Sequence, residues 1–175
     1  VSDFRAVYLP NGQAEMFTSN VRYTEDVATT DPATWQPYEM RVNHPLRVGS
    51  TRVYLQGHGF APTFTVTFPN GETRTDTQPW QPTELQTFLY PDLAERRTQQ
   101  IAVQGLFAPT ASFDGTILSS RFPRMDDPAV AIDVYQGDAG LDTGRPQSVF
   151  SLDSDLIESG ALERRARVNL MPGES

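Results

Sequence analysis

Residues 38–71 read YEMRVNHPLRVGSTRVYLQGHGFAPTFTVTFPNG, and they decide the fold that the sequence predicts. Within them, residues 63–68 (TFTVTF) alternate strictly between threonine and an apolar residue, which is the pattern of a strand with one buried face. The tripeptide PNG at 69–71 is a turn signal, and residues 72–77 are expected to return as a polar partner strand. The stretch therefore indicates antiparallel β structure built from hairpins.

Short alternating runs separated by turn residues continue on both sides of this stretch. Further strands are expected at 4–9, 13–23, 38–42, 51–56, 99–107, 116–118, 129–135 and 147–152. One helix is expected at 83–90, because Thr83 is a suitable N-cap and Pro91 would end the helix. Fourteen prolines and twelve glycines agree with many turns. The predicted fold class is mostly β, an antiparallel β-sandwich or open barrel with long loops and one short helix.

The chain of 175 residues is long enough to form one domain with a substantial core. We expect residues 1–152 to form a single β domain, and residues 153–175 to be a charged tail or linker with a short helix at 155–163. No window of about 18 apolar residues and no signal peptide occurs. Because an initiator Met is also missing, we expect the chain to be a piece of a longer protein.

The net charge of −8 argues against nucleic acid as a partner and against simple adsorption to anionic lipid. All 14 basic residues are arginine, for which a GC-rich coding sequence is the favoured explanation; the alternative is that the planar arginine fork serves carboxylates such as haem propionates. Cysteine is absent, which excludes disulfides, thiol nucleophiles and cysteine metal sites.

Motifs of catalysis are missing from the sequence. It contains no HExxH, no GxSxG elbow and no P-loop. Acidic pairs at 126–127 and 153–155 are neighbours in sequence, which does not place two carboxylates across a substrate. Asp138 and Asp142 lack the EF-hand spacing and fit an Asp- and Gly-rich turn.

The two histidines, His44 and His58, stand 14 positions apart in two expected turns. One interpretation makes either or both of them ligands of haem iron. The other makes them ordinary turn residues, with His44 bonded to the backbone ahead of Pro45. His58 is the stronger candidate ligand, because its flanking glycines leave room for a flat group to approach the backbone.

Several long segments together resemble one family. They are FRAVYLPNGQAEMFTSNVRY at 4–23, VNHPLRVGSTRVYLQGHGFAPTFTV at 42–66, QGLFAPTA at 104–111 and VYQGDAGLDTGRPQSVFSLD at 134–153. In this order they are similar to the ResB family, the membrane protein of system II cytochrome c synthesis, and most closely to its actinobacterial-type members. The resemblance covers most of the chain.

The resemblance implies that this chain is the extracytoplasmic domain of a membrane-anchored parent. Such a domain would scaffold haem delivery and attachment to apocytochrome c, together with a ResC/CcsA-type membrane protein, and would perform no turnover by itself. The family's essential histidines are thought to lie in or near membrane helices outside this chain, so no catalytic residue is carried over.

The assembly-factor interpretation predicts an open apolar groove near residues 43–62, rimmed by arginine. The candidate haem contacts are His58 and His44, and the candidate partner surface comprises Asn43, Pro45, Tyr54, Gly57, Gly59, Phe60 and Pro62. Two alternatives stay open. A peptide- or sugar-binding module predicts a peptide paired with an exposed strand edge, and a secreted hydrolase predicts a pocket with convergent carboxylates.

Overall fold

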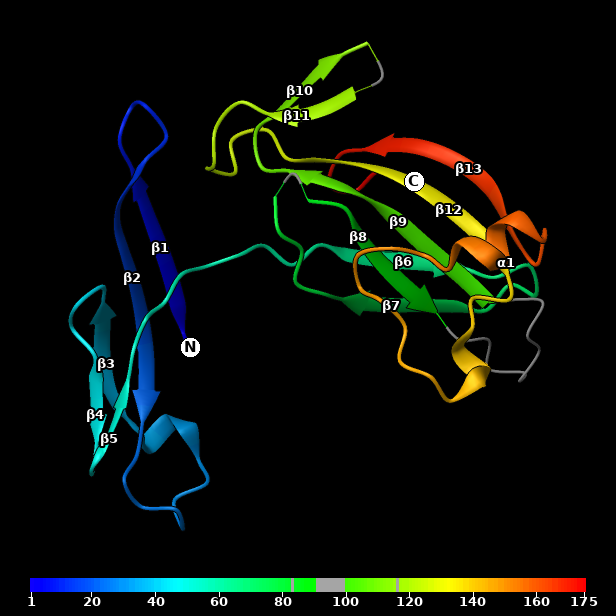
Figure 1. Cartoon of the computed structure of the whole chain (residues 1–175). Coiled ribbons are helices and arrows are strands. Elements are labelled where there is room, and N and C mark those ends of the chain that lie inside the picture. The colour runs from blue at the N-terminus through cyan, green and yellow to red at the C-terminus, as the bar shows by residue number, and fades with distance from the viewer. Residues whose placement is uncertain (83, 91–99, 116) are drawn as a thin grey trace. The chain divides into compact units, whose positions relative to one another are not determined.

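The computed structural model describes residues 1–82, 84–90, 100–115 and 117–175 (Figure 1). These residues are mostly antiparallel β structure with one short α-helix, and their sheets do not close into a barrel, so the predicted fold class is confirmed. The chain divides into two compact units, Val1–His58 and Gly59–Ser175, where the sequence predicted one domain over 1–152. In the described part of the chain, no helix is long and apolar enough to cross a membrane.

The first unit is built on a three-stranded sheet and a small hairpin. The sheet has the order β1 (Asp3–Tyr8), β2 (Ala14–Tyr23), β3 (Gln36–Arg41), and the hairpin pairs β4 (Leu46–Val48) with β5 (Thr51–Val53). A single 3-10 turn, η1 (Pro32–Thr34), lies in the loop between β2 and β3. The Trp35 indole N–H donates to the Thr29 carbonyl at 3.0 Å, which ties that loop together.

The second unit centres on a four-stranded antiparallel sheet of order β13-β12-β9-β8 (Figure 1). Its strands are β8 (Gln86–Tyr90), β9 (Gln100–Ala108), β12 (Ala129–Gly137) and β13 (Leu162–Leu170). Two hairpins accompany it, β6 (Thr63–Thr67) with β7 (Thr73–Thr77), and β10 (Ala111–Asp114) with β11 (Ile117–Ser120). The connection from β12 to β13 holds the 3-10 turn η3 (Leu141–Thr143) and the helix α1 (Ser154–Glu158).

The main core lies between hairpin β6–β7 and one face of the four-stranded sheet. The buried members of this cluster are Phe68, Trp80, Phe88, Tyr90, Ile101, Val103, Phe107, Val130 and Ile132. Phe64 points inward from β6 as its alternating pattern predicts, with its ring 5.2 Å from that of Trp80 and 6.0 Å from that of Phe88. Trp80 is only 1% exposed, so this aromatic group closes the layer between hairpin and sheet.

The opposite face of the sheet carries two smaller apolar clusters with a polar row between them. One cluster packs sheet residues against the 139–156 connection and includes Ala102, Tyr135 and Leu162. The other packs the sheet against hairpin β10–β11 and includes Ala108 and Leu118. Both faces of the sheet are therefore largely covered by other parts of the same unit.

The polar row crosses all four strands in register: Thr87 pairs with Gln104, Gln104 with Asp133, and Asp133 with Arg167. Arg167 donates from Nε and a terminal nitrogen to the two Asp133 oxygens at 2.6 and 2.7 Å. Arg164 approaches the same carboxylate at 3.6 Å. The hydrogen bonds from Arg167 are the main reason that the pKa of Asp133 lies below its ordinary value.

Three predicted elements differ from the structure. Residues 86–90 form strand β8 instead of the end of a helix, because Gln86, Thr87 and Phe88 are all buried by pairing with β9; Thr83 lies outside the described residues. Residues 147–152 form no strand, although the Ser148 and Val149 carbonyls accept hydrogen bonds from Thr87 at the edge of β8.

The expected tail at 153–175 is the third difference. The predicted helix is shortened to α1, and residues 162–170 form β13, a strand paired with β12 over nearly its whole length. Its outward arginines hide the period-two pattern of Ala166, Val168 and Leu170, whose side chains face the core. Burial of that apolar set draws the segment into the sheet.

Gly105 offers a stability test of how closely β9 and β12 approach. A Cβ added there would lie 2.2 Å from the Ala131 carbonyl oxygen and 2.8 Å from the Ile132 Cα. We expect Gly105→Ala to lower the free energy of unfolding by about 2–4 kcal/mol. Gly57→Ala is the matched control, since a Cβ at Gly57 meets no atom within 4 Å, and it should change stability by less than about 0.5 kcal/mol. Urea unfolding of both variants measures the difference; equal midpoints would contradict the close approach.

The Asp133–Arg167 pair predicts a pH dependence. A carboxyl whose folded pKa is lowered contributes stability above its unfolded pKa and loses that contribution as pH falls through the folded value. We expect Asp133→Asn to be destabilised by about 1 kcal/mol at pH 7, because the arginine is largely exposed and the pair is screened. The gap to wild type should close as the pH falls below about 4. Asp114→Asn, at an exposed hairpin residue, is the control; equal stability of Asp133→Asn and wild type at pH 7 would contradict the stabilising role of the pair.

Candidate functional site

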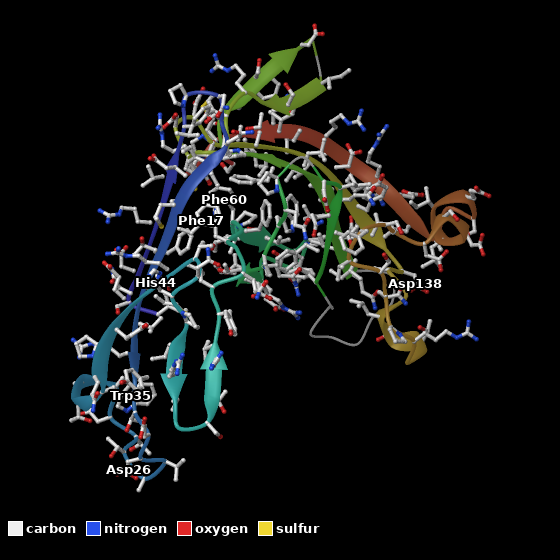
Figure 2. The ribbon with its side chains drawn as sticks, turned by 60° about the vertical axis from the view of Figure 1, so that its left-hand side comes forward. Phe17, Asp26, Trp35, His44, Phe60 and Asp138 are labelled. Atoms are coloured by element: carbon white, nitrogen blue, oxygen red, sulfur yellow. The ribbon has the colours of Figure 1, made fainter. Side chains whose placement is uncertain are left out.

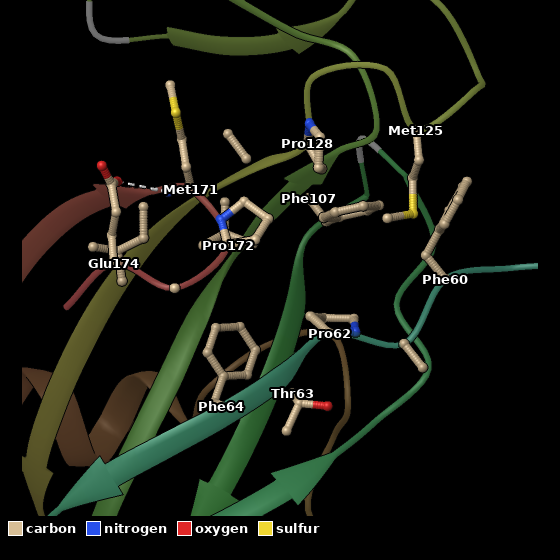
Figure 3. A pocket seen from close by; sticks show the side chains of 15 residues that line it. Phe60, Pro62, Thr63, Phe64, Phe107, Met125, Pro128, Met171, Pro172 and Glu174 are labelled. Atoms are coloured by element: carbon tan, nitrogen blue, oxygen red, sulfur yellow. Dashed lines mark hydrogen bonds between the residues drawn. The ribbon is translucent and has the colours of Figure 1, made fainter.

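An apolar pocket of about 370 Å³ lies in the second unit, where β9 and β13 end and β12 begins (Figure 3). Its lining residues are Phe60, Ala61, Pro62, Thr63, Phe64, Phe107, Met125, Pro128, Ala129, Val130, Leu170, Met171, Pro172, Gly173 and Glu174. Phe64, Phe107, Val130 and Leu170 also belong to the main core cluster. The pocket is thus a part of the core that opens to solvent at one end of the sheet.

The entrance segment to β6 forms one wall of the pocket. The Trp80 N–H donates to the Phe60 carbonyl at 2.8 Å, and the two residues form an isolated bridge that holds this segment in place. The Phe60 ring lies 5.2 Å from that of Phe107. Backbone pairing and aromatic contact therefore fix Phe60 at the mouth of the pocket (Figure 3).

The last residues of the chain form a lip on the other side. Glu174 accepts a hydrogen bond from the Met171 N–H at 2.8 Å, and the Glu174 N–H donates to the Met171 carbonyl at 3.1 Å. Gly173 has φ +85°, which a turn of this kind allows only glycine to adopt easily. Glu174 is the one ionisable side chain among the described residues that line the pocket.

The chemistry of the lining suits binding. Met125 and Met171 are 55% and 49% exposed, and methionine adapts its shape to varied apolar partners. Among the described lining residues there is no histidine, and one carboxylate stands alone. No group of three or more His, Cys, Asp or Glu side chains that could hold a metal ion is found in the described ranges. The convergent carboxylates that a hydrolase would need are therefore missing here.

The predicted partner surface is divided between the two units. Phe60 and Pro62 line the pocket, and Gly59 comes immediately before them at the start of the second unit. No arginine is among the described residues that line this pocket, whose ionisable residue is the acidic Glu174; the arginine rim expected for a groove near residues 43–62 stays a prediction. The lip at 171–174 was not predicted, because residues 153–175 were expected to be a charged tail; the alternation that ends at Leu170 is the feature of the sequence that indicates strand β13 before it.

The other predicted surface residues belong to the first unit. Asn43 has φ +65° in the turn after β3, a conformation that asparagine tolerates better than most residues. The Pro45 carbonyl accepts a hydrogen bond from the Tyr38 hydroxyl at 3.1 Å. Tyr54 is 50% exposed, and Gly57 has open space where a side chain would be. These residues shape the irregular segments around β4 and β5.

His58 is held in an aromatic cluster on the sheet of the first unit. Its ring centroid lies 4.9 Å from that of Phe4 and 4.8 Å from that of Phe17. The Tyr8 hydroxyl and His58 Nε2 are hydrogen-bonded at 2.6 Å. Burial raises the pKa of Tyr8, so this hydroxyl remains a neutral phenol at physiological pH. Residues of β1 and β2, far from it in sequence, thus hold the His58 side chain at the end of the first unit.

His44 lies in the turn between β3 and β4, where its backbone N–H donates to the Arg41 carbonyl at 2.9 Å (Figure 2). Its side chain is exposed. Within the described residues, its ring makes no hydrogen bond or aromatic contact. The two histidines therefore have different surroundings, one within an aromatic cluster and the other in an open turn.

The residues around the histidines do not fit an iron-ligating site as they are arranged. Of the two ring nitrogens of His58 that could ligate iron, Nε2 is bonded to the Tyr8 hydroxyl, and the ring packs against Phe4 and Phe17. His44 is exposed, and histidine is absent from the described lining of the apolar pocket. Haem contact at His58 and His44 stays a prediction that titration can test.

The acidic residues considered in the sequence analysis serve local structure. Asp138 accepts a hydrogen bond from the Gly140 N–H at 2.8 Å, and Asp142 accepts one from the Gln100 amide at 2.9 Å. Asp126 pairs with Arg124 at 2.6 Å, and Asp153 caps α1 by accepting from the Asp155 N–H. These contacts agree with turn and cap roles for these carboxylates.

Fold and pocket together define an antiparallel β protein with an apolar cavity. The family comparison then identifies its family: the chain belongs to the ResB-like family, whose model matches residues 1–174. This family consists of membrane-associated cytochrome c biogenesis proteins, so membership indicates a role in that process. Comparisons with curated proteins and with solved structures gave no match.

A haemin titration followed by Soret absorbance tests the two histidines. We expect wild type, His58→Ala and His44→Ala to give the same titration curve, because His58 Nε2 is bonded to Tyr8 and neither histidine lines the apolar pocket. Tyr8→Phe is the matched control, since it removes the hydroxyl bonded to His58 and keeps the aromatic ring. A saturable Soret shift that is lost in one histidine variant would instead identify that residue as a ligand.

Proposed function

We propose that this chain is the extracytoplasmic domain of a membrane-anchored cytochrome c assembly factor and acts there as a scaffold. It binds a protein partner, apocytochrome c or a ResC/CcsA-type membrane protein, while haem is delivered and attached. The match of the ResB-like family over residues 1–174 is the observation that carries this proposal.

The pocket supports a binding role in this process. The cavity is apolar, and two exposed methionines, whose unbranched side chains adapt to varied shapes, belong to its lining. Such a cavity suits the insertion of apolar side chains from another protein. Its lining offers no nucleophile–base pair and no set of metal ligands among the described residues, so the proposal includes no turnover by this chain alone.

Filling the pocket tests this role. Ala61 is exposed and lines the pocket, so Ala61→Trp should occupy the cavity without disturbing the core. We expect at least a fivefold fall in covalently attached haem when the variant replaces the wild-type protein in cells, measured by haem staining of c-type cytochromes. Ala33→Trp is the matched control at an exposed residue of the first unit, and it should leave attachment unchanged.

Immunoblotting should show equal amounts of both variants. Full haem attachment with Ala61→Trp would contradict the proposed role of the pocket.

A further inference from the structure

We infer that the outer edge of β13, with the apolar pocket at its end, binds an extended segment of a protein partner as an added antiparallel strand. The segment carries an apolar anchor for the pocket and, five or six residues later, acidic side chains. This inference rests on the proposed partner-binding role of the pocket and adds the form and chemistry of the bound segment.

The first observation is that the connection before α1 pairs with one edge strand of the sheet, β8, and that β13 at the other edge has no such partner among the described residues. β8, at one edge, is covered by the connection before α1: the Thr87 N–H donates to the Val149 carbonyl at 2.8 Å, and its hydroxyl donates to the Ser148 carbonyl at 2.9 Å. β13, at the other edge, extends over nine residues and pairs only with β12 in the described part of the chain. An uncovered edge of this length offers a row of backbone donors and acceptors to an added strand.

The second observation is the continuity of this edge with the pocket. Leu170 ends β13, and both Leu170 and Met171 line the pocket (Figure 3). A segment that runs antiparallel to β13 begins beside Leu170, so one of its first side chains can enter the cavity. Backbone pairing then supplies affinity along the strand, while the pocket selects the anchoring side chain.

The third observation is the charge of the strand. β13 contains three arginines in a chain whose net charge is −8: Arg167 and, at 3.6 Å, Arg164 share the Asp133 carboxylate of β12, and Arg165 pairs with Glu163 of its own strand. The Arg165–Glu163 pair joins side chains that are both more than half exposed, and such pairs contribute at most about 1 kcal/mol. A carboxylate of the partner can therefore replace Glu163 at little cost.

The spacing of anchor and acid follows from strand geometry. Leu170 and Arg165 are five residues apart, which at about 3.4 Å per residue is roughly 17 Å along the strand. An acidic side chain five or six positions after the apolar anchor would thus reach Arg165 or Arg164. The geometry favours this segment over a second copy of the chain, because two antiparallel β13 strands would bring arginines together.

The test uses a fluorescein-labelled synthetic nonapeptide of alternating valine and threonine, with phenylalanine at its first position and glutamate at its sixth and seventh. Fluorescence anisotropy measures its binding to the purified chain. We expect saturable binding, at least tenfold weaker for Arg165→Glu and for Ala61→Trp. The matched controls Arg145→Glu and Ala33→Trp, both at exposed sites elsewhere, should bind within twofold of wild type. Circular dichroism checks that each variant is folded.

Backbone pairing is tested with two N-methylated versions of the peptide, methylated at its odd or at its even positions. Only the version whose methyl groups face β13 should lose binding, and the peptide of reversed sequence should bind at least tenfold more weakly. Equal binding of all versions, no effect of Arg165→Glu, or dimerisation of the chain that Arg165→Glu alters would each overturn the inference.

Different results would overturn the proposed role of the pocket and the inference about β13. If the peptide does not bind while Ala61→Trp still lowers haem attachment in cells, the inference about β13 is overturned and the scaffold function stands. If the peptide binds as expected and Ala61→Trp leaves haem attachment unchanged, the strand-binding inference stands and the proposed role of the pocket in haem attachment is overturned.

Discussion

The second unit depends on burial of one aromatic and aliphatic cluster between hairpin β6–β7 and one face of the four-stranded sheet. Neither layer can shield its apolar side from water alone, so each is stable only against the other. Trp80 is buried in this contact. Its backbone N–H donates to the Phe60 carbonyl, and this hydrogen bond connects the core to the residue at the mouth of the pocket. The same residues that form the core therefore also form much of the wall of the cavity.

The sequence predicted those parts of the fold in which local pattern and tertiary burial agree. The alternation of 63–68 identified the inward face of β6, because one side of that strand is buried and the other is solvated. The prediction from sequence was wrong at β8, where capping signals suggested a helix. The segment is buried on both faces and forms a strand. The prediction was wrong again at β13, whose arginines mask the apolar alternation.

The candidate site was predictable only in part, for a related reason. Phe60 and Pro62 were found because they stand in a distinctive segment, whereas the lip at 171–174 comes from the other end of the chain. His58 attracted attention as a ligand because glycines flank it, yet its environment is set by Phe4, Tyr8 and Phe17 from distant strands. Membership of the ResB-like family supplies the biological process, and the pocket supplies a place where binding can occur.

The polar row across the sheet also determines which strand alignments can compete during folding. A slip of one residue between β12 and β13 would turn Arg167 toward the apolar core and leave the Asp133 carboxylate opposite Ala166 or Val168, so both charges would lose their partner. A slip of two residues would keep the faces of β13 but place Asn169 or Arg165 opposite Asp133 in place of Arg167. The Asp133–Arg167 ion pair thus favours the observed register most strongly over the slips of one residue.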